Sequence, residues 1–129
     1  MEPQYKFEIF ISDCADGISK VFITQGAMQT ARSDFNLNTQ RQVFEFIGSM
    51  GIEKPRFINS KPWENNNDNT VVIMVDAYAF YSGLIYGYIA FFHQPKTNRW
   101  VIKSLKKNQE PDTRNLAFGE ALNQLLGRS

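Results

Sequence analysis

The segment from Val71 to Lys107 contains three apolar runs: VVIMVDAYAF (71–80), IYGYIAFF (85–92) and RWVIKSLKK (99–107). Each run is rich in β-branched and aromatic residues, and short links that are polar or contain Gly or Pro separate them. This pattern is typical of consecutive antiparallel strands joined by turns. We therefore expect a β-meander on which the rest of the chain packs.

The N-terminal half shows strand and helix periods in turn. Tyr5–Ile11 alternates apolar and polar residues and predicts a first strand, and residues 18–23 extend it or pair with it. Gln25–Arg32 is a short helix with Thr24 as its N-cap. Asn38–Met50 is a clearer helix, with Asn38 as N-cap and Gly51 just beyond its end. Its expected buried face comprises Val43, Phe46, Ile47 and Met50.

The remaining segments complete an α+β domain. Arg56–Ile58 is expected to be a short strand, and Ser60–Asn69 a polar surface loop around Trp63. Thr113–Leu125 has an apolar helical face and predicts a C-terminal helix capped by Asp112 or Thr113. We expect one domain, residues 1–129, with an antiparallel meander sheet, two helices from the N-terminal half and the C-terminal helix packed on it.

The composition excludes several classes of protein. With 129 residues, 43% of them hydrophobic, the chain is long enough to bury one core. A single cysteine, Cys14, and a single histidine leave no pair for a disulfide and no cluster for zinc, so we expect neither a metal nor a cofactor. No apolar run approaches the roughly 20 residues of a membrane span, and the N-terminus does not read as a signal peptide. A soluble cytoplasmic protein with no membrane partner is the expectation.

Charge is unevenly distributed along the chain. The formal net charge is +1, but residues 93–129 carry +4 and the preceding residues −3. Such a distribution favours a local anion site over a general polyanion-binding surface.

The candidate site is inferred from the way side chains alternate between the two faces of the last two predicted strands. Arg99, Lys103 and Lys107 should share one face of the last strand with Val101 and Leu105, opposite the face that carries Trp100, Ile102 and Ser104. In the preceding strand Tyr86, Tyr88 and Phe92 lie together, but the sequence leaves open whether they face the cations or the core.

If the tyrosines face the cations, the surface combines positive charge with aromatic rings, as in proteins that bind single-stranded RNA. The competing interpretation is a solvated amphipathic strand whose lysines protect a sheet edge. His93, at the head of the HQPKTN turn, can titrate near neutral pH and is either a catalytic candidate or an ordinary turn residue.

The run YGYIAFFHQPKTNRWVIKSLKKNQEPDTRNLAFGEAL (86–122) resembles the C-terminal half of the RelE-like and HigB-like toxins of toxin–antitoxin systems. The matching positions are Tyr88–Phe92, Val101–Leu105, Lys106, Lys107, Gln109, Pro111, Ala117 and Ala121. Two positions depart from the pattern. Gly87 stands where the HigB-like strand usually has Arg, and Gln25-Gly26 where a related helix motif usually has His.

The resemblance implies metal-independent cleavage of RNA by attack of a ribose 2′-hydroxyl on the adjacent phosphate. The catalytic candidates are then Tyr86, Tyr88, Lys106 and His93, and the nucleic-acid-binding candidates are Arg99, Lys103 and Lys107. His93 and the lysine pair lie at opposite ends of the hairpin, so one phosphate cannot contact both, and we favour the tyrosine–lysine end. The alternative is a non-catalytic protein-interaction module, such as an inhibitor, immunity or adaptor protein. Its partner would be antitoxin-like or a target protein, and the two departures favour it.

Overall fold

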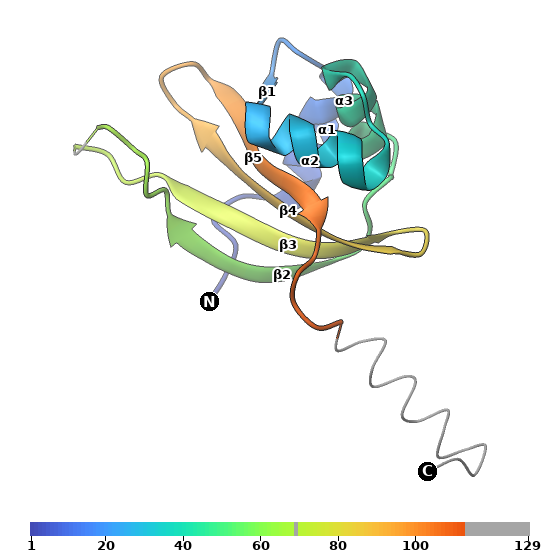
Figure 1. Cartoon of the computed structure of the whole chain (residues 1–129). Helices are drawn as coiled ribbons and strands as arrows, with labels where there is room; N and C mark the ends of the chain where they lie inside the picture. The colour runs from blue at the N-terminus through green and yellow to red at the C-terminus, as the bar shows by residue number, and fades with distance from the viewer. Residues whose placement is uncertain (69, 113–129) are drawn as a thin grey trace, which may run out of the picture.

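The computed structural model describes residues 1–68 and 70–112, and within these it contains three helices and one five-stranded sheet (Figure 1). The α+β class is confirmed. The expected C-terminal helix, Thr113–Leu125, lies outside the described residues. The helices are α1 (Phe7–Asp16), α2 (Gln25–Phe35) and α3 (Gln40–Gly48). The strands are β1 (Val21–Ile23), β2 (Glu53–Pro62), β3 (Met74–Ser82), β4 (Ile85–Gln94) and β5 (Arg99–Lys107).

The sheet has the strand order β1-β5-β4-β3-β2. Strands β2 to β5 pair antiparallel with their neighbours, which confirms the expected meander. Strand β1 adds to the other side of β5 in parallel, with Phe22 opposite Val101. Figure 1 shows the three helices gathered on one side of the sheet. None of these helices, within the described part of the chain, is long and apolar enough to cross a membrane.

The expected first strand at Tyr5–Ile11 is wrong, because Phe7–Asp16 forms helix α1. The sequence fits both a strand period and a helix period. Apolar residues occupy the odd-numbered positions from Tyr5 to Ile11, as in a strand, but Phe7, Phe10, Ile11 and Cys14 are also spaced i, i+3, i+4 and i+7, as on one face of a helix. The helical set is the one that is used, since Phe10 and Cys14 are buried while Ile9 is half exposed. Residues 21–23 accordingly pair with β5 and not with an N-terminal strand.

The two other helices lie close to their expected positions. Thr24 caps α2 as expected, its side chain accepting the Ala27 N–H at 3.2 Å. Helix α3 is capped by Thr39 and not by Asn38, and it ends at Gly48. Met50 was expected on the buried face, yet it lies beyond the helix with a φ of 71° and is 78% exposed. Phe44 is buried in its place, beside Val43 and Ile47.

Strand β2 is longer than the expected Arg56–Ile58 and takes the first residues of the expected polar loop at 60–69. Among the described residues it is an edge strand that pairs with β3 alone, and its register shifts twice. Most of its side chains are exposed, so it lacks the apolar alternation by which a strand is recognised in a sequence.

The main core fills the space between the helices and the sheet. At its centre the rings of Phe10 and Phe91 stack with centroids 3.9 Å apart, and Trp100 packs edge-on against both. A buried carboxylate, Asp76, accepts the backbone N–H groups of Gln4 and Tyr5 and so fixes the entry to α1.

A β-bulge in β5 changes which side chains share a face. Ala90 pairs with Ser104, but its neighbour Phe91 pairs with Ile102, so Lys103 is the extra residue. Beyond the bulge the alternation is inverted, and Leu105 joins Trp100 and Ile102 in the main core. The expected common face for Arg99, Lys103, Leu105 and Lys107 is therefore wrong beyond Lys103, and Lys107 follows Leu105 to the helix side.

Candidate nucleic-acid interface

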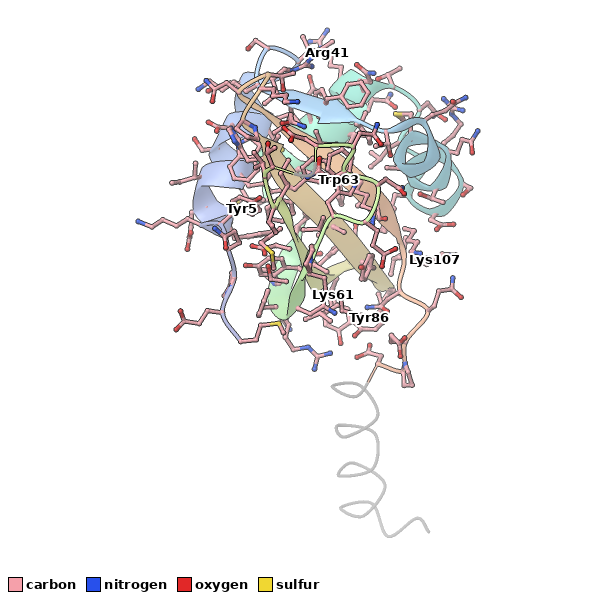
Figure 2. The ribbon with its side chains drawn as sticks, turned by 90° about the vertical axis from the view of Figure 1, so that its left-hand side faces the viewer. Tyr5, Arg41, Lys61, Trp63, Tyr86 and Lys107 are labelled. Carbon is pink, nitrogen blue, oxygen red and sulfur yellow. The ribbon has the colours of Figure 1, made fainter. Side chains whose placement is uncertain are left out.

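The side of the sheet turned away from the helices is called the open face here. A second, smaller apolar cluster lies on it, separate from the main core, and is formed by Ile73, Val75, Ala77, Ala90 and Phe92. Trp63, Tyr88 and Val101 pack against this cluster. Figure 2 shows Trp63 lying across the strands, with Lys61 and Tyr86 farther along them. The candidate site is built on this face.

A shallow groove of about 130 Å³ crosses the open face. Its floor contains the small side chains of Ala77 on β3 and Ala90 on β4, which pair with each other. Lys61 from β2 and Lys103 from β5 line it from either side. Three inter-strand steps separate β2 from β5, so the two backbones are about 14 Å apart. Small residues between two cations leave room for a flat or extended anionic ligand.

Tyr88 and Lys106 form one end of this surface. The two residues are directly paired across β4 and β5, and the Lys106 Nζ lies 5.5 Å from the centroid of the Tyr88 ring. Tyr86, two residues along the same face, accepts a hydrogen bond from Arg56 at 3.2 Å. The alternative left open by the sequence is thus decided, because the tyrosines face the open side together with Lys103 and Lys106.

Burial raises the pKa of the Tyr88 hydroxyl above its ordinary value. A tyrosine hydroxyl is protonated at neutral pH, and a raised pKa keeps it so, which leaves the phenol able to donate a hydrogen bond to a phosphate oxygen or a proton to a more basic leaving oxygen. It is poorly suited to accept a proton from an attacking hydroxyl.

The three lysines of the surface are available to a ligand. Lys61 and Lys103 are exposed and Lys106 is half-buried. None of the ion pairs found among residues 1–68 and 70–112 involves any of them. Binding a phosphate therefore breaks no salt bridge in that part of the chain.

Two predicted site residues lie away from this surface. His93 pairs with Trp100, and its ring lies 5.1 Å from the Trp100 ring, against the main core. The backbone N–H of Lys107 donates to Asp34 of α2 at 2.9 Å, and Figure 2 shows Lys107 apart from Lys61 and Tyr86. Neither residue is brought together with Tyr88 and Lys106.

Arg99 is engaged in holding β1 in place. Its Nη2 donates to the carbonyl oxygens of Ile18 and Val21, at 2.8 and 2.9 Å, and its guanidinium lies 5.8 Å from the Phe22 ring. These contacts assign it a structural task at the edge of the sheet.

Gly87, one of the two positions that depart from the toxin pattern, faces the main core. A Cβ atom there would lie 2.4 Å from the Phe80 ring, so the fold has no room for an arginine at this position. The residues that sequence reasoning missed are Lys61, Arg56, Glu64 and Ser104. The first two are on the edge strand that was not recognised at full length, and Ser104 is brought to the open face by the bulge.

An apolar cavity of about 610 Å³ lies apart from the open face, between the end of α1 and the start of α3. The two charged residues that line it, Arg41 and Glu45, pair with each other at 2.9 Å. It therefore offers no unpaired cation to an anionic ligand.

Comparisons with protein-family models, with the curated proteins and with the solved structures found no match for this chain. The open face itself is thus the source of any functional inference.

Proposed function

We propose that the protein binds single-stranded RNA along the groove of the open face. The observation that carries the proposal is the alanine-floored groove lined by Lys61 and Lys103 and continued by the Tyr88–Lys106 pair. Lysines neutralise phosphates, and exposed aromatic faces stack on unpaired bases. A duplex is a poorer fit, because its bases are stacked inside and are not accessible to a tyrosine on a sheet.

The test compares lysines of the open face with Lys107, which points to the helix side. Lys106→Ala and Lys103→Ala should each weaken the binding of a single-stranded RNA oligonucleotide, measured by fluorescence anisotropy over a range of salt concentrations. Each lost phosphate contact should lower the slope of log K against log salt by about 0.7.

Lys107→Ala is the matched control, since it removes the same charge from the helix side. It should leave the affinity and its salt slope close to those of the unaltered protein. If Lys107→Ala weakens binding as much as Lys106→Ala does, the open face is not the binding surface. If the unaltered protein binds no RNA, the proposal fails and the protein-interaction module becomes the better reading.

Cleavage of the bound RNA is a second candidate, favoured by the protonated Tyr88 beside Lys106 and by the resemblance to the RelE-like and HigB-like toxins. Glu64 lines the same groove and is the carboxylate that would take the proton of the ribose 2′-hydroxyl. The 2′-oxygen would bond to phosphorus, and the bond to the 5′-oxygen would break as Tyr88 protonates it. The products would be a 2′,3′-cyclic phosphate and a 5′-hydroxyl, with the lysines stabilising the phosphorane.

The cleavage reaction is tested on the same oligonucleotide by gel electrophoresis. Tyr88→Phe and Glu64→Gln should each abolish cleavage, whereas His93→Ala should leave it intact. Intact RNA after incubation with the unaltered protein would rule cleavage out while leaving the binding proposal in place.

A further inference from the structure

A second cavity on the open face, of about 420 Å³, has the character of a pocket for a single planar ring. Three aromatic side chains line it, and they come from three separate segments: Phe22 of β1, Trp63 after β2, and Phe92 of β4. Val101 of β5 also lines it. Aromatic rings that converge on an open space favour a ligand that stacks.

The aromatic rings are held in place by the fold. Trp63 stacks on Phe92 with centroids 4.5 Å apart and planes 29° apart, and its backbone N–H donates to the Ile73 carbonyl at 2.7 Å. Phe22 is 45% exposed although it belongs to a strand whose two other residues are buried. The cavity is thus preformed, and a ligand would cover an apolar ring that is now in contact with solvent.

The polar side chains that line the cavity offer hydrogen-bond donors to a ligand. Gln94 lines the cavity, and its side-chain oxygen is already occupied by the backbone N–H of Lys96 at 3.2 Å. The amide nitrogen of Gln94 has no hydrogen-bond partner in the part of the chain that the structure describes, so it is left to donate to a ligand. Lys103 adds a second donor at the cavity wall.

Lys103 lines both this cavity and the alanine-floored groove. A ring bound between Phe22 and Trp63 would therefore lie next to the cation that lines the groove. A nucleotide matches this arrangement, with its base in the aromatic cavity and its phosphate at Lys103. The chain of a longer RNA would then continue along the groove towards Lys106.

We propose that the aromatic cavity is a base-binding subsite that takes one unpaired base of single-stranded RNA and prefers uracil to adenine. Uracil presents two carbonyl oxygens, either of which can accept from the Gln94 amide nitrogen, whereas the base-pairing edge of adenine presents an amino donor beside a single ring-nitrogen acceptor. The inference rests on the proposed RNA-binding function, because both use Lys103 as the contact for a phosphate.

The experiment titrates the protein with uridine 5′-monophosphate and with adenosine 5′-monophosphate while following tryptophan fluorescence. Trp63 lines the cavity, whereas Trp100 is buried in the main core, so quenching should come from Trp63. In Trp63→Phe the quenching should disappear. In Trp63→Ala the affinity for the RNA oligonucleotide should fall about 5-fold to 150-fold, the usual worth of one stacked base.

Gln94→Glu tests the hydrogen-bonding sense with little change in shape. Glutamate keeps an oxygen for the Lys96 N–H but replaces the donor with a negative acceptor, so uridine monophosphate should bind about tenfold more weakly or worse. Gln42→Glu is the matched control, since the Gln42 side-chain oxygen likewise accepts a backbone N–H, from Asn38, but lies on α3. It should leave nucleotide binding unchanged.

The outcomes separate this inference from the function on which it rests. If the RNA binds through Lys103 and Lys106 but Trp63→Ala and Gln94→Glu bind it as tightly as the unaltered protein does, the base subsite is refuted and the RNA-binding function stands. Equal quenching by the two nucleotides would refute the preference for uracil. Uridine monophosphate that quenches Trp63 in a protein without affinity for RNA would support the subsite and refute the proposed function.

Discussion

Replacing Gly87 by alanine tests how tightly the sheet and helices are packed, because this glycine lies beneath a buried ring. Gly87 pairs with Phe80 across β3 and β4, and Phe80 is fully buried. A Cβ atom at Gly87 would lie 2.4, 2.7 and 2.8 Å from three atoms of the Phe80 ring. Contacts this short require the ring to move, and Phe35 stacks on it with centroids 5.7 Å apart.

The expected cost follows from two opposing contributions. Overpacking a well-filled core costs about 1–3 kcal/mol. Alanine in a strand recovers about 0.5–1 kcal/mol relative to glycine, because the unfolded chain loses less freedom. Gly87→Ala should therefore lower the free energy of unfolding by about 1–2 kcal/mol, or the melting temperature by roughly 4 °C per kcal/mol.

The assay is urea unfolding followed by circular dichroism, with Gly26→Ala as the control. A Cβ at Gly26 meets nothing within 4 Å, so alanine in this helix should raise the stability by about 0.5–1 kcal/mol. In a Phe80→Leu background the cost of Gly87→Ala should shrink, since the shorter side chain leaves room for the methyl group. Equal costs in both backgrounds, or a stabilised Gly87→Ala, would refute the reasoning.

Two further predictions concern buried polar groups. Asp76→Asn should lower the free energy of unfolding by about 2 kcal/mol, because the amide has one acceptor oxygen for the two N–H groups of Gln4 and Tyr5; an unchanged urea midpoint would contradict this. Burial, with the nearby charges of Asp76 and Glu8, raises the pKa of Tyr78 to about 12. The unfolded tyrosine loses its proton near pH 10, so this contribution to stability is complete below pH 10 and is lost as the pH rises towards 12. Tyr78→Phe should make that loss shallower in urea titrations at pH 9 and pH 11, and parallel pH profiles for the two proteins would count against it.

The central strands could be predicted from the sequence because their side chains are buried, and burial selects the β-branched and aromatic residues by which a strand is recognised. Strand β2 could not be predicted at full length, since an exposed edge strand is under no such selection. At Phe7–Asp16 the apolar residues fit both a strand and a helix, and the packing of Phe10 against Phe91 shows that the segment is a helix.

The candidate site was predicted in part. Tyr88 and Lys103 were named from residue type and alternation and Lys106 from the toxin resemblance, and the three share the open face. Lys107 was placed with them, and the structure separates it from them. His93 was expected at the opposite end of the hairpin, and it lies there, paired with Trp100. Lys107 was placed on the wrong face because the bulge adds one residue at Lys103, and this inverts the alternation of the side chains that follow. The residue types around Lys103 give no sign of the bulge.

The parallel pairing of β1 with β5 bears on the order in which the chain can fold. Val21 lies opposite Trp100, so β1, the second element of the chain, has its strand partner in β5, the last strand among residues 1–68 and 70–112. During synthesis α1 and β1 emerge long before the strand that they need, and α2 likewise packs against β5. We therefore expect α1 and α2 to remain loosely packed until the chain has been synthesised as far as residue 107. Formation of the complete sheet should then be late and slow. Truncation of the chain before β5 should therefore leave no stable fragment, because α2 and β1 would lose the strand on which they pack and Phe10 would lose its contact with Trp100.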